Sequence, residues 1–159
     1  QGVMGSAAQQ GRTGALDDAA ANDGFNLVTQ QTAEWNAEKA QQIVQSVIDA
    51  GTPFNVIYAE NDDMAKGAVA ALDKANISHG VGKDVIVMGF DCNKWALEEL
   101  KAGNWNYDGQ CNPFQASYID EIIKKLENGE TISEKTIIMD EKGFDATTIT
   151  QEDVDNYGI

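Results

Sequence analysis

The sequence is poor in the residues from which many catalytic and metal sites are built. Its 159 residues include one histidine, His79, and two cysteines, Cys92 and Cys111. Two cysteines are too few for a disulfide scaffold, and their spacing is unlike that of a zinc site. The sequence contains neither a Ser/His/Asp arrangement nor a glycine-rich phosphate-binding motif. These absences disfavour an enzyme and favour a protein that binds without catalysis.

Positive charge and long apolar runs are also scarce. The chain has 11 Lys and Arg against 26 Asp and Glu, which gives a net charge of −15. Nucleic acid and anionic membranes would be repelled at long range, so we expect no nucleic-acid partner. No apolar run approaches the roughly 18 residues that a membrane span needs. The hydrophobic fraction of 42 % is nevertheless sufficient for the core of one domain.

The hydrophobic pattern alternates between strands and helices about five times. It predicts strand segments at residues 1–5, 25–29, 56–58, 85–90, 105–110 and 136–139. It predicts helices that begin after Ser6, Asn36, Asn61, Asn93 and Asn112, with a last helical turn after Thr150. This order predicts an α/β fold, in which an open parallel sheet carries helices on both faces as a three-layer structure.

The stretch from Asn55 to Ala65 is the most informative part of the chain. Residues 56–58 are a short β-rich run, and Asn61 or Asp62 then caps a helix. Polar side chains at the carboxyl end of a strand, just before a helix, are where open α/β sheets bind small ligands. We therefore expect Asn61 to face a ligand.

Two further polar positions follow predicted strands. Asp91 ends the strand at 85–90, and Gln110, Cys111 and Asn112 follow the strand at 105–110. The carboxyl ends of parallel strands share one edge, so these groups are expected to converge with Asn61. A carboxylate such as Asp91 needs partners there, and adjacent sugar hydroxyls donate to one carboxylate in pairs.

Three residues from earlier in the chain complete the predicted site. Trp35 ends a loop after a predicted strand and could cover the apolar face of a sugar ring. Gln10 and Arg12 lie on the first helix near the same edge. Simpler roles stay open: Asp91 and Asn61 as helix caps, Trp35 as a core residue, and Arg12 as a purely structural partner of a carboxylate.

Three motifs resemble the C-terminal half of the type I periplasmic sugar-binding proteins. They are AENDDMAKGA at residues 59–68, GKDVIVMGFD at 82–91 and QCNP at 110–113. With the opening residues 1–6 and Arg12, the resemblance covers essentially the whole chain. It implies that Asn61 and Asp91 hydrogen-bond a sugar and that Trp35 contacts it.

The same resemblance bears on the remaining site residues. Gln10 matches a position often held by Arg, which implies a ligand other than ribose. The last polar contact falls on Gln110 or Cys111, because the spacing to Pro113 is ambiguous by one residue. The implied function is that of an extracytoplasmic solute receptor of an ABC transporter, periplasmic or held at the cell surface as a lipoprotein. It implies a monosaccharide ligand, permease subunits as partners and no cofactor.

The chain is about half as long as that family leads one to expect. Residues 1–112 are then a C-terminal, ligand-binding lobe, and residues 131–159 its return strand and tail. The helix within residues 113–130 would belong to an N-terminal lobe that is missing. A strand that precedes Gln1 and normally lies inside the sheet would also be absent or cut short. We expect the apolar stripe of residues 113–128 to mediate dimerisation or swapping. A disulfide between Cys92 and Cys111 is a less favoured expectation.

Two other functions remain as alternatives. The effector-binding core of a lac-repressor-type regulator shares the fold, and an upstream helix-turn-helix would decide for it. A metal-dependent enzyme could use Asp62, Asp63 and Asp91 to hold Mg²⁺. The first two of these acids are better explained by the first turn of a helix, where negative charge is favourable.

Overall fold

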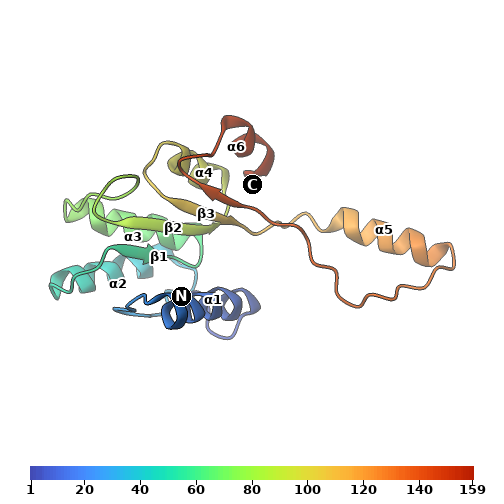
Figure 1. Ribbon diagram of the computed structural model, residues 1–159, viewed down its shortest axis with the longest axis horizontal. Helices are drawn as coiled ribbons and strands as arrows, with labels where there is room; N and C mark the ends of the chain where they lie inside the picture. Colours follow the sequence, from blue (N-terminus) through green and yellow to red (C-terminus); the bar gives the residue numbers. More distant parts are fainter.

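A computed structural model describes the whole chain, residues 1–159, in which an arm projects from a sheet covered by helices (Figure 1). The helices are α1 (Ala7–Asp23), α2 (Ala37–Asp49), α3 (Asp62–Lys74), α4 (Lys94–Lys101), α5 (Ala116–Glu127) and α6 (Gln151–Tyr157). The strands are β1 (Val56–Tyr58), β2 (Ile86–Asp91), β3 (Tyr107–Gln110) and β4 (Gly143–Asp145).

The four strands form one open sheet in the order β1-β2-β3-β4. The pairs β1–β2 and β2–β3 are parallel, which confirms the predicted α/β fold. The edge strand β4 is antiparallel to β3, so the sheet is not wholly parallel. The strand predicted at residues 136–139 is wrong: this segment lies in the arm with no strand beside it, and Ile138 is 87 % exposed.

The main core lies between the sheet and the helices α3 and α4. The crossovers β1-α3-β2 and β2-α4-β3 run in the same direction, and right-handed connections place both helices on one face. Val87 of β2, Leu97 of α4 and Leu72 of α3 are fully buried there. Helix α2 packs on α3, and a Cβ on Gly67 would lie 2.0 Å from the carbonyl oxygen of Ala37. That contact requires a glycine.

The opposite face of the sheet is occupied near the site by α1. The rings of Tyr58 and Phe90 meet edge to face, with centroids 5.3 Å apart. The guanidinium of Arg12 lies 4.8 Å from the centroid of the Phe90 ring. The hydroxyl of Tyr58 donates to the main-chain carbonyl of Arg12 at 3.0 Å. These contacts hold α1 against the carboxyl ends of β1 and β2.

The outer edge of β1 is not paired with another strand, and an apolar groove of about 510 Å³ lies beside it. Residues of α1, α2 and the segment 25–31 line this groove, including Leu16, Val44 and Leu27. The strand predicted at residues 25–29 is wrong, since that segment is irregular. The groove separates it from β1, and an extended segment without a neighbouring strand forms no ladder.

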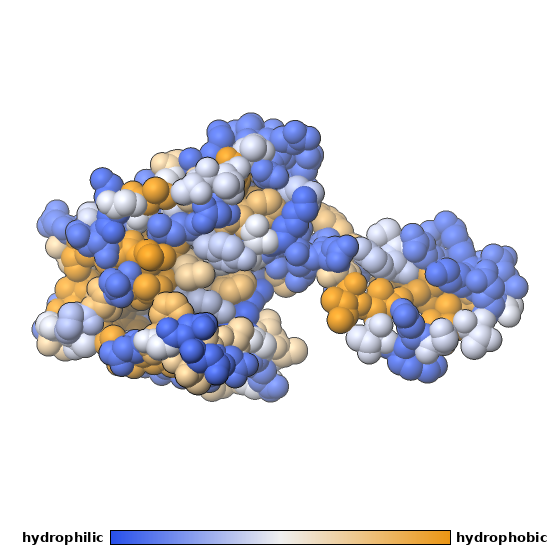
Figure 2. Space-filling view, viewed as in Figure 1, coloured by the Kyte–Doolittle hydropathy of each residue, from blue (hydrophilic) through white to orange (hydrophobic).

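The arm comprises residues 112–142 and leaves the sheet after β3 (Figure 1). No residue of α5 is buried. Its apolar side chains form an exposed stripe, in which Ile119, Ile123 and Leu126 are 48–56 % exposed (Figure 2). No helix in the chain is long and apolar enough to span a bilayer.

Four of the predicted helix starts are confirmed by cap hydrogen bonds. The side chains of Ser6, Asn36, Asn61 and Thr150 each accept a hydrogen bond from the backbone three residues on. The Asn93 side chain makes no such bond. The start predicted at Asn112 is wrong: α5 begins at Ala116, and the Asn112 side chain accepts instead from the Phe114 amide at 2.9 Å.

Candidate ligand-binding site

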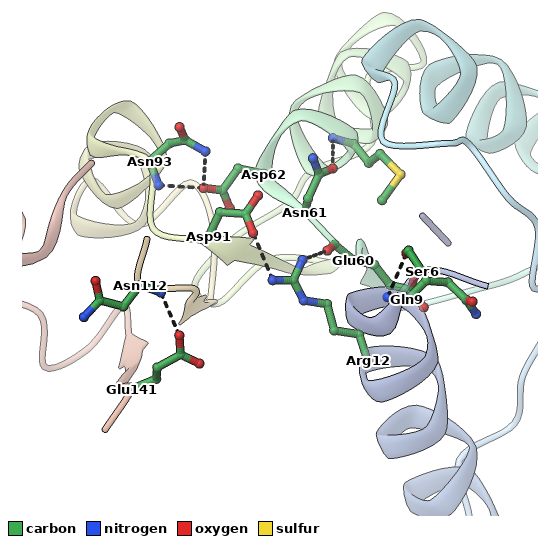
Figure 3. Close-up of polar contacts among 11 residues, drawn as sticks. Ser6, Gln9, Arg12, Glu60, Asn61, Asp62, Asp91, Asn93, Asn112 and Glu141 are labelled. Carbon is green, nitrogen blue, oxygen red and sulfur yellow. Dashed lines mark hydrogen bonds and ion pairs between the residues drawn. The ribbon is translucent and has the colours of Figure 1, made fainter. Parts of the chain in front are cut away.

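The predicted site lies at the carboxyl ends of β1, β2 and β3. Strand β1 is followed by Asn61, β2 ends at Asp91, and β3 ends at Gln110. Asp91 and Gln110 are register partners in the sheet, and β1 pairs with β2 one step away. The expected convergence of strand ends is therefore present, and Figure 3 shows Asn61, Asp91 and Arg12 around one region.

Arg12 and Asp91 form the centre of this region. One Nη atom of Arg12 donates to Oδ1 of Asp91 at 2.9 Å, and the other donates to the main-chain carbonyl of Glu60 (Figure 3). The second oxygen of Asp91 has no hydrogen bond within the protein, and the Asp91 side chain is 27 % exposed. Burial raises the pKa of Asp91, and the adjacent Arg12 opposes that rise. Arg12 thus fills a structural role and still leaves Asp91 an open acceptor.

The backbone around Asp91 has an unusual conformation. Asp91 has φ 115° and Cys92 has φ 61°, in the region that residues other than glycine rarely adopt. Such conformations persist only where surrounding contacts enforce them, and they gather at functional sites. The turn therefore points to a carboxylate whose position is held at some cost in free energy.

Asn61 caps α3 and also offers a free donor. Its Oδ1 accepts from the Met64 amide at 3.0 Å, which confirms the capping role. Its Nδ2 makes no hydrogen bond within the protein, although the residue is only 8 % exposed. Capping and ligand contact are compatible here because they use different atoms of the amide.

Trp35 lies between the core and the candidate site. It is half-buried and packs against the hydrophobic core, with φ 64°. Its ring centroid is 5.8 Å from the guanidinium carbon of Arg12. A Cβ on Gly2 would lie 2.1 Å from the Trp35 ring, so the opening segment passes directly over it. Trp35 is therefore partly a core residue, as the simpler alternative held, and also a neighbour of the site.

Gln10 lies away from the site, on the exposed side of α1. Its Nε2 donates to the Gly5 carbonyl at 3.0 Å. The preceding residue, Gln9, is the buried one, and its Nε2 donates to the Thr13 hydroxyl at 2.8 Å. Residues 9, 12 and 13 share one helix face, and Gln10 is rotated by about 100° from Gln9 on a helix of 3.6 residues per turn.

The residues after β3 are divided between the site and the arm. Gln110 accepts from the Lys142 amide at 3.2 Å, and its Nε2 has no protein partner. Cys111 is exposed and lies close enough to Arg12 for that cation to oppose the rise in its pKa that burial causes. The backbone amide of Asn112 donates to the Glu141 carboxylate at 2.7 Å, and the Asn112 side chain points away from Arg12 (Figure 3).

Cys92 and Cys111 are both free thiols, so the disulfide, which was the less favoured alternative, is absent. Cys92 is buried in the turn directly after Asp91, whereas Cys111 is exposed directly after β3. Burial raises the pKa of the Cys92 thiol, which keeps it protonated and unreactive.

Glu60 is a residue of the site region that the sequence pattern did not reveal. It is 2 % exposed, and its carboxylate accepts from the Gly2 amide at 2.7 Å and from the Thr13 hydroxyl. Glu60 therefore joins the opening segment and α1 to the end of β1. A glutamate before Asn61 and two aspartates is typical of an exposed helix start, so the sequence carries no signal of this burial.

Asp62 and Asp108 form a second unpredicted cluster beneath Asp91. Both are fully buried, and Asp108 is the register partner of Gly89, whose Cβ position would lie 2.6 Å from Oδ1 of Asp62. The Oδ2 atom of Asp62 accepts from the backbone amide of Asn93 at 2.8 Å and from its side chain at 3.1 Å. Burial and mutual repulsion raise the pKa of Asp108. An acid inside the strand predicted at 105–110 was the signal that could have marked it.

The arrangement suits recognition of a polyol better than catalysis or metal binding. The chain has no group of three or more His, Cys, Asp or Glu side chains placed to hold a metal ion, which removes the support for the Mg²⁺ alternative. The open groups are an amide donor on Asn61, a carboxylate oxygen on Asp91 and an amide donor on Gln110. Hydroxyl groups both donate and accept, so they can satisfy all three.

Residues 1–131 match the family described as "Periplasmic binding protein domain". The chain therefore belongs to that family, as the motifs and the fold had indicated.

Similar proteins include two importer components. The chain is 31 % identical over 132 residues to the fructose import binding protein of Bifidobacterium longum, which covers 82 % of this chain and 38 % of that protein. It is 31 % identical over 101 residues to the ribose import binding protein of Bacillus subtilis, which covers 64 % of this chain and 31 % of that protein. The chain thus spans less than half the length of these relatives.

Solved structures support the same fold. A solute-binding protein from Actinobacillus succinogenes with bound D-allose superposes with a TM-score of 0.79 at 29 % identity, covering 99 % of this chain and 53 % of that one. A galactofuranose-binding protein superposes with a TM-score of 0.85 at 22 % identity, with the same coverages of 99 % and 53 %.

Proposed function

We propose that this chain is the ligand-binding C-terminal lobe of an extracytoplasmic monosaccharide receptor that serves an ABC importer. The observation that carries the proposal is the pair of open polar atoms on adjacent strand ends. Asn61 keeps a free Nδ2 donor and Asp91 a free carboxylate oxygen beside Arg12. The named relatives are ribose and fructose import binding proteins, and one structural neighbour holds D-allose.

The assignment of lobes follows from the shape of the arm. Residues 1–112 and 131–159 contain the sheet, while residues 113–130 contain α5, of which no residue is buried. We assign α5 to a second lobe of the receptor, which would cover its apolar stripe. Sugar would then bind between the lobes and draw them together, as hinged binding proteins do.

The receptor binds its sugar without changing it chemically and delivers it to permease subunits. The site offers hydrogen-bond donors and acceptors, but no nucleophile with an adjacent base. No observation favours the alternative role as the effector-binding core of a transcription regulator.

The test is a ligand screen on the complete polypeptide encoded by the gene, however far it extends beyond residues 1–159. D-ribose, D-fructose, D-allose and myo-inositol are added singly, and the unfolding temperature is followed, because a ligand of the native state raises it. We expect one or more of them to raise it and to bind by calorimetry. Absence of binding by these and other pentoses and hexoses would contradict the proposal.

A matched pair of variants ties binding to the site. Asn61→Ala and Thr150→Ala each remove a helix cap, at a cost of about 1 kcal/mol of stability. Thr150 caps the start of α6, whereas the opposite end of α6 meets the Asp91–Cys92 turn through Ile159. Only Asn61→Ala should weaken sugar binding, by about tenfold or more for a lost hydrogen bond to a polar ligand. Equal affinities of the two variants would remove Asn61 from the site.

Residues 1–159 alone should bind sugar only weakly, because half of the contacts would be missing. Calorimetric binding of a monosaccharide to this fragment at micromolar affinity or better would contradict the two-lobe assignment.

A further inference from the structure

Two buried acids, Asp62 and Asp108, lie beside Gly89 of β2, two residues before Asp91 in the chain. Asp62 begins α3 and Asp108 lies in β3, and both side chains have no exposed surface. Oδ1 of Asp62 and both oxygens of Asp108 make no hydrogen bond of good geometry. The backbone amide of Cys92 lies near Asp108 and opposes the rise in its pKa. A Cβ on Gly89 would lie 2.6 Å from Oδ1 of Asp62, and Gly89 is the register partner of Asp108. The glycine therefore leaves room for both carboxyl groups on one face of the sheet.

The charged groups around the pair do not compensate two negative charges. Asp91 faces both acids and adds to the repulsion, and the neutral thiol of Cys92 lies beside them. Asp63 on α3 faces Asp91. The one cation in this region, Arg12, pairs with Asp91, and neither Asp62 nor Asp108 takes part in a salt bridge.

Ionising both acids would be costly in free energy. An isolated buried charge costs several kcal/mol, and two carboxylates that share a site cannot both ionise near neutral pH. A single proton between them solves this problem, because the protonated acid becomes a donor to the other carboxylate. Oδ1 of Asp62 and one oxygen of Asp108 then satisfy each other.

We propose that Asp62 and Asp108 share one proton, and that the protonated pair is the positioning element for Asp91. The sharing of the proton stands on the buried geometry alone. Its effect on ligand affinity rests on the proposed function as a sugar receptor.

The route from the pair to Asp91 is short. Oδ2 of Asp62 holds both the backbone and the side-chain nitrogen of Asn93, which follows the strained Asp91–Cys92 turn. The hydrogen bond from Asp108 fixes the other end of the same carboxyl group. Loss of the proton would break that bond and add a second buried charge next to Asp91. The two acids would then move apart and displace Asn93, so the turn would keep only the support that the Ile159 amide gives to the Cys92 carbonyl.

The first experiment observes the proton directly. The complete polypeptide is labelled with ¹³C at the aspartate side chains, and carboxyl chemical shifts are recorded from pH 4 to pH 9. Spectra of Asp62→Asn and Asp108→Asn assign the two signals. We expect a carboxyl signal of the pair to keep its protonated shift at pH 7. Ionisation of both groups below pH 6 would overturn the proposal.

The second experiment measures affinity against pH, with D-ribose, D-fructose, D-allose and myo-inositol titrated in turn. We expect the wild-type affinity to fall on the alkaline side, by up to about tenfold for each pH unit above the point at which the pair loses its proton. In Asp108→Asn, an amide donates to Asp62 at every pH, so its affinity should change less than about twofold from pH 6 to pH 9.

Asp18→Asn is the matched control, since Asp18 lies on the exposed surface of α1. It removes the same charge and should keep the wild-type pH profile. A flat wild-type profile, or an equally steep one in Asp108→Asn, would overturn the positioning role. If no sugar binds at any pH, the proposed function fails, whereas the carboxyl titration still decides whether the proton is shared.

Discussion

Arg12 and Asp91 are 79 residues apart in the chain, yet their side chains form an ion pair at 2.9 Å. The pair fastens the first helix to the end of the central strand. Since the guanidinium also reaches the Glu60 carbonyl and lies on the Phe90 ring, one residue joins α1, β1 and β2. The candidate site is therefore shaped before any ligand arrives.

Removal of Arg12 should destabilise the fold. Arg12→Met keeps the apolar stem but leaves Asp91 without its cation, and we expect a loss of roughly 1–3 kcal/mol, less than for a fully buried pair because Asp91 is partly exposed. Arg12→Lys keeps the charge but cannot reach both partners, so its stability should lie between those of the wild type and Arg12→Met. Urea denaturation measures both, and losses below about 0.5 kcal/mol would contradict the role given to Arg12.

Stability should decline as the pH rises from 5 to 9. Burial raises the pKa of Asp62 and Asp108, so the folded state holds protons that the unfolded chain releases near pH 4. The stabilising contribution is complete below that pH and is lost as pH rises through the folded-state pKa values. The slope should approach about 1.4 kcal/mol per pH unit for each proton involved. In Asp108→Asn, the unfolding free energy from urea denaturation should depend less on pH. An unchanged slope against pH would show that Asp108 is not the source of the pH dependence.

Two glycines in helices should respond in opposite ways to alanine. Gly67→Ala places a methyl group 2.0 Å from the Ala37 carbonyl and should destabilise the α2–α3 contact by at least 1–3 kcal/mol, as overpacking does. Gly14→Ala in α1 has no atom within 4 Å and should stabilise by about 0.5–1 kcal/mol. The unfolding temperature should fall in Gly67→Ala and rise in Gly14→Ala. A rise in Gly67→Ala would show that α2 and α3 can move apart at little cost in free energy.

The arm should make the isolated 159-residue chain self-associate. The apolar stripe of α5 is solvent-exposed, and patches of this kind favour contact with another copy. We expect a dimer at micromolar concentrations in sedimentation equilibrium. The double variant Ile119→Lys, Ile123→Lys should be monomeric, whereas Glu121→Lys, which changes charge without touching the stripe, should not be. A monomeric wild type would refute this expectation.

The two thiols should differ sharply in reactivity. Cys111 is exposed and Cys92 is buried with its pKa raised. A thiol reagent should therefore modify one cysteine in the native chain and two after denaturation. Rapid modification of both in the native state would mean that the Asp91 turn opens readily.

The sequence was sufficient for the local features that depend on a few neighbouring residues. The parallel strands were predicted at 56–58, 85–90 and 105–110 and lie at 56–58, 86–91 and 107–110. The caps at Ser6, Asn36, Asn61 and Thr150 follow from the known preferences of helix starts. The convergence of Asn61 and Asp91 followed from the rule that parallel strands share a carboxyl edge.

The features that escaped depend on distant partners. Residues 25–29 and 136–139 have strand-like composition, but no neighbouring strand completes a ladder. Glu60 looks like a surface acid at a helix start until the fold encloses it, whereas the only signal for Asp108 is its place inside a predicted strand. The prediction put Gln10 in the site, but its neighbour Gln9 is the residue that faces inward. The helix pattern does not determine which of two adjacent glutamines does so.

The unpaired edge of β1 has a consequence for handling the protein. An exposed backbone edge beside an apolar groove is a template on which another molecule can add a strand. The net charge of −15 keeps copies apart only while their fields overlap, and at 1 M salt the screening length shrinks to about 3 Å. Concentrated salt therefore removes the electrostatic repulsion that opposes aggregation, and buffer of low ionic strength preserves it.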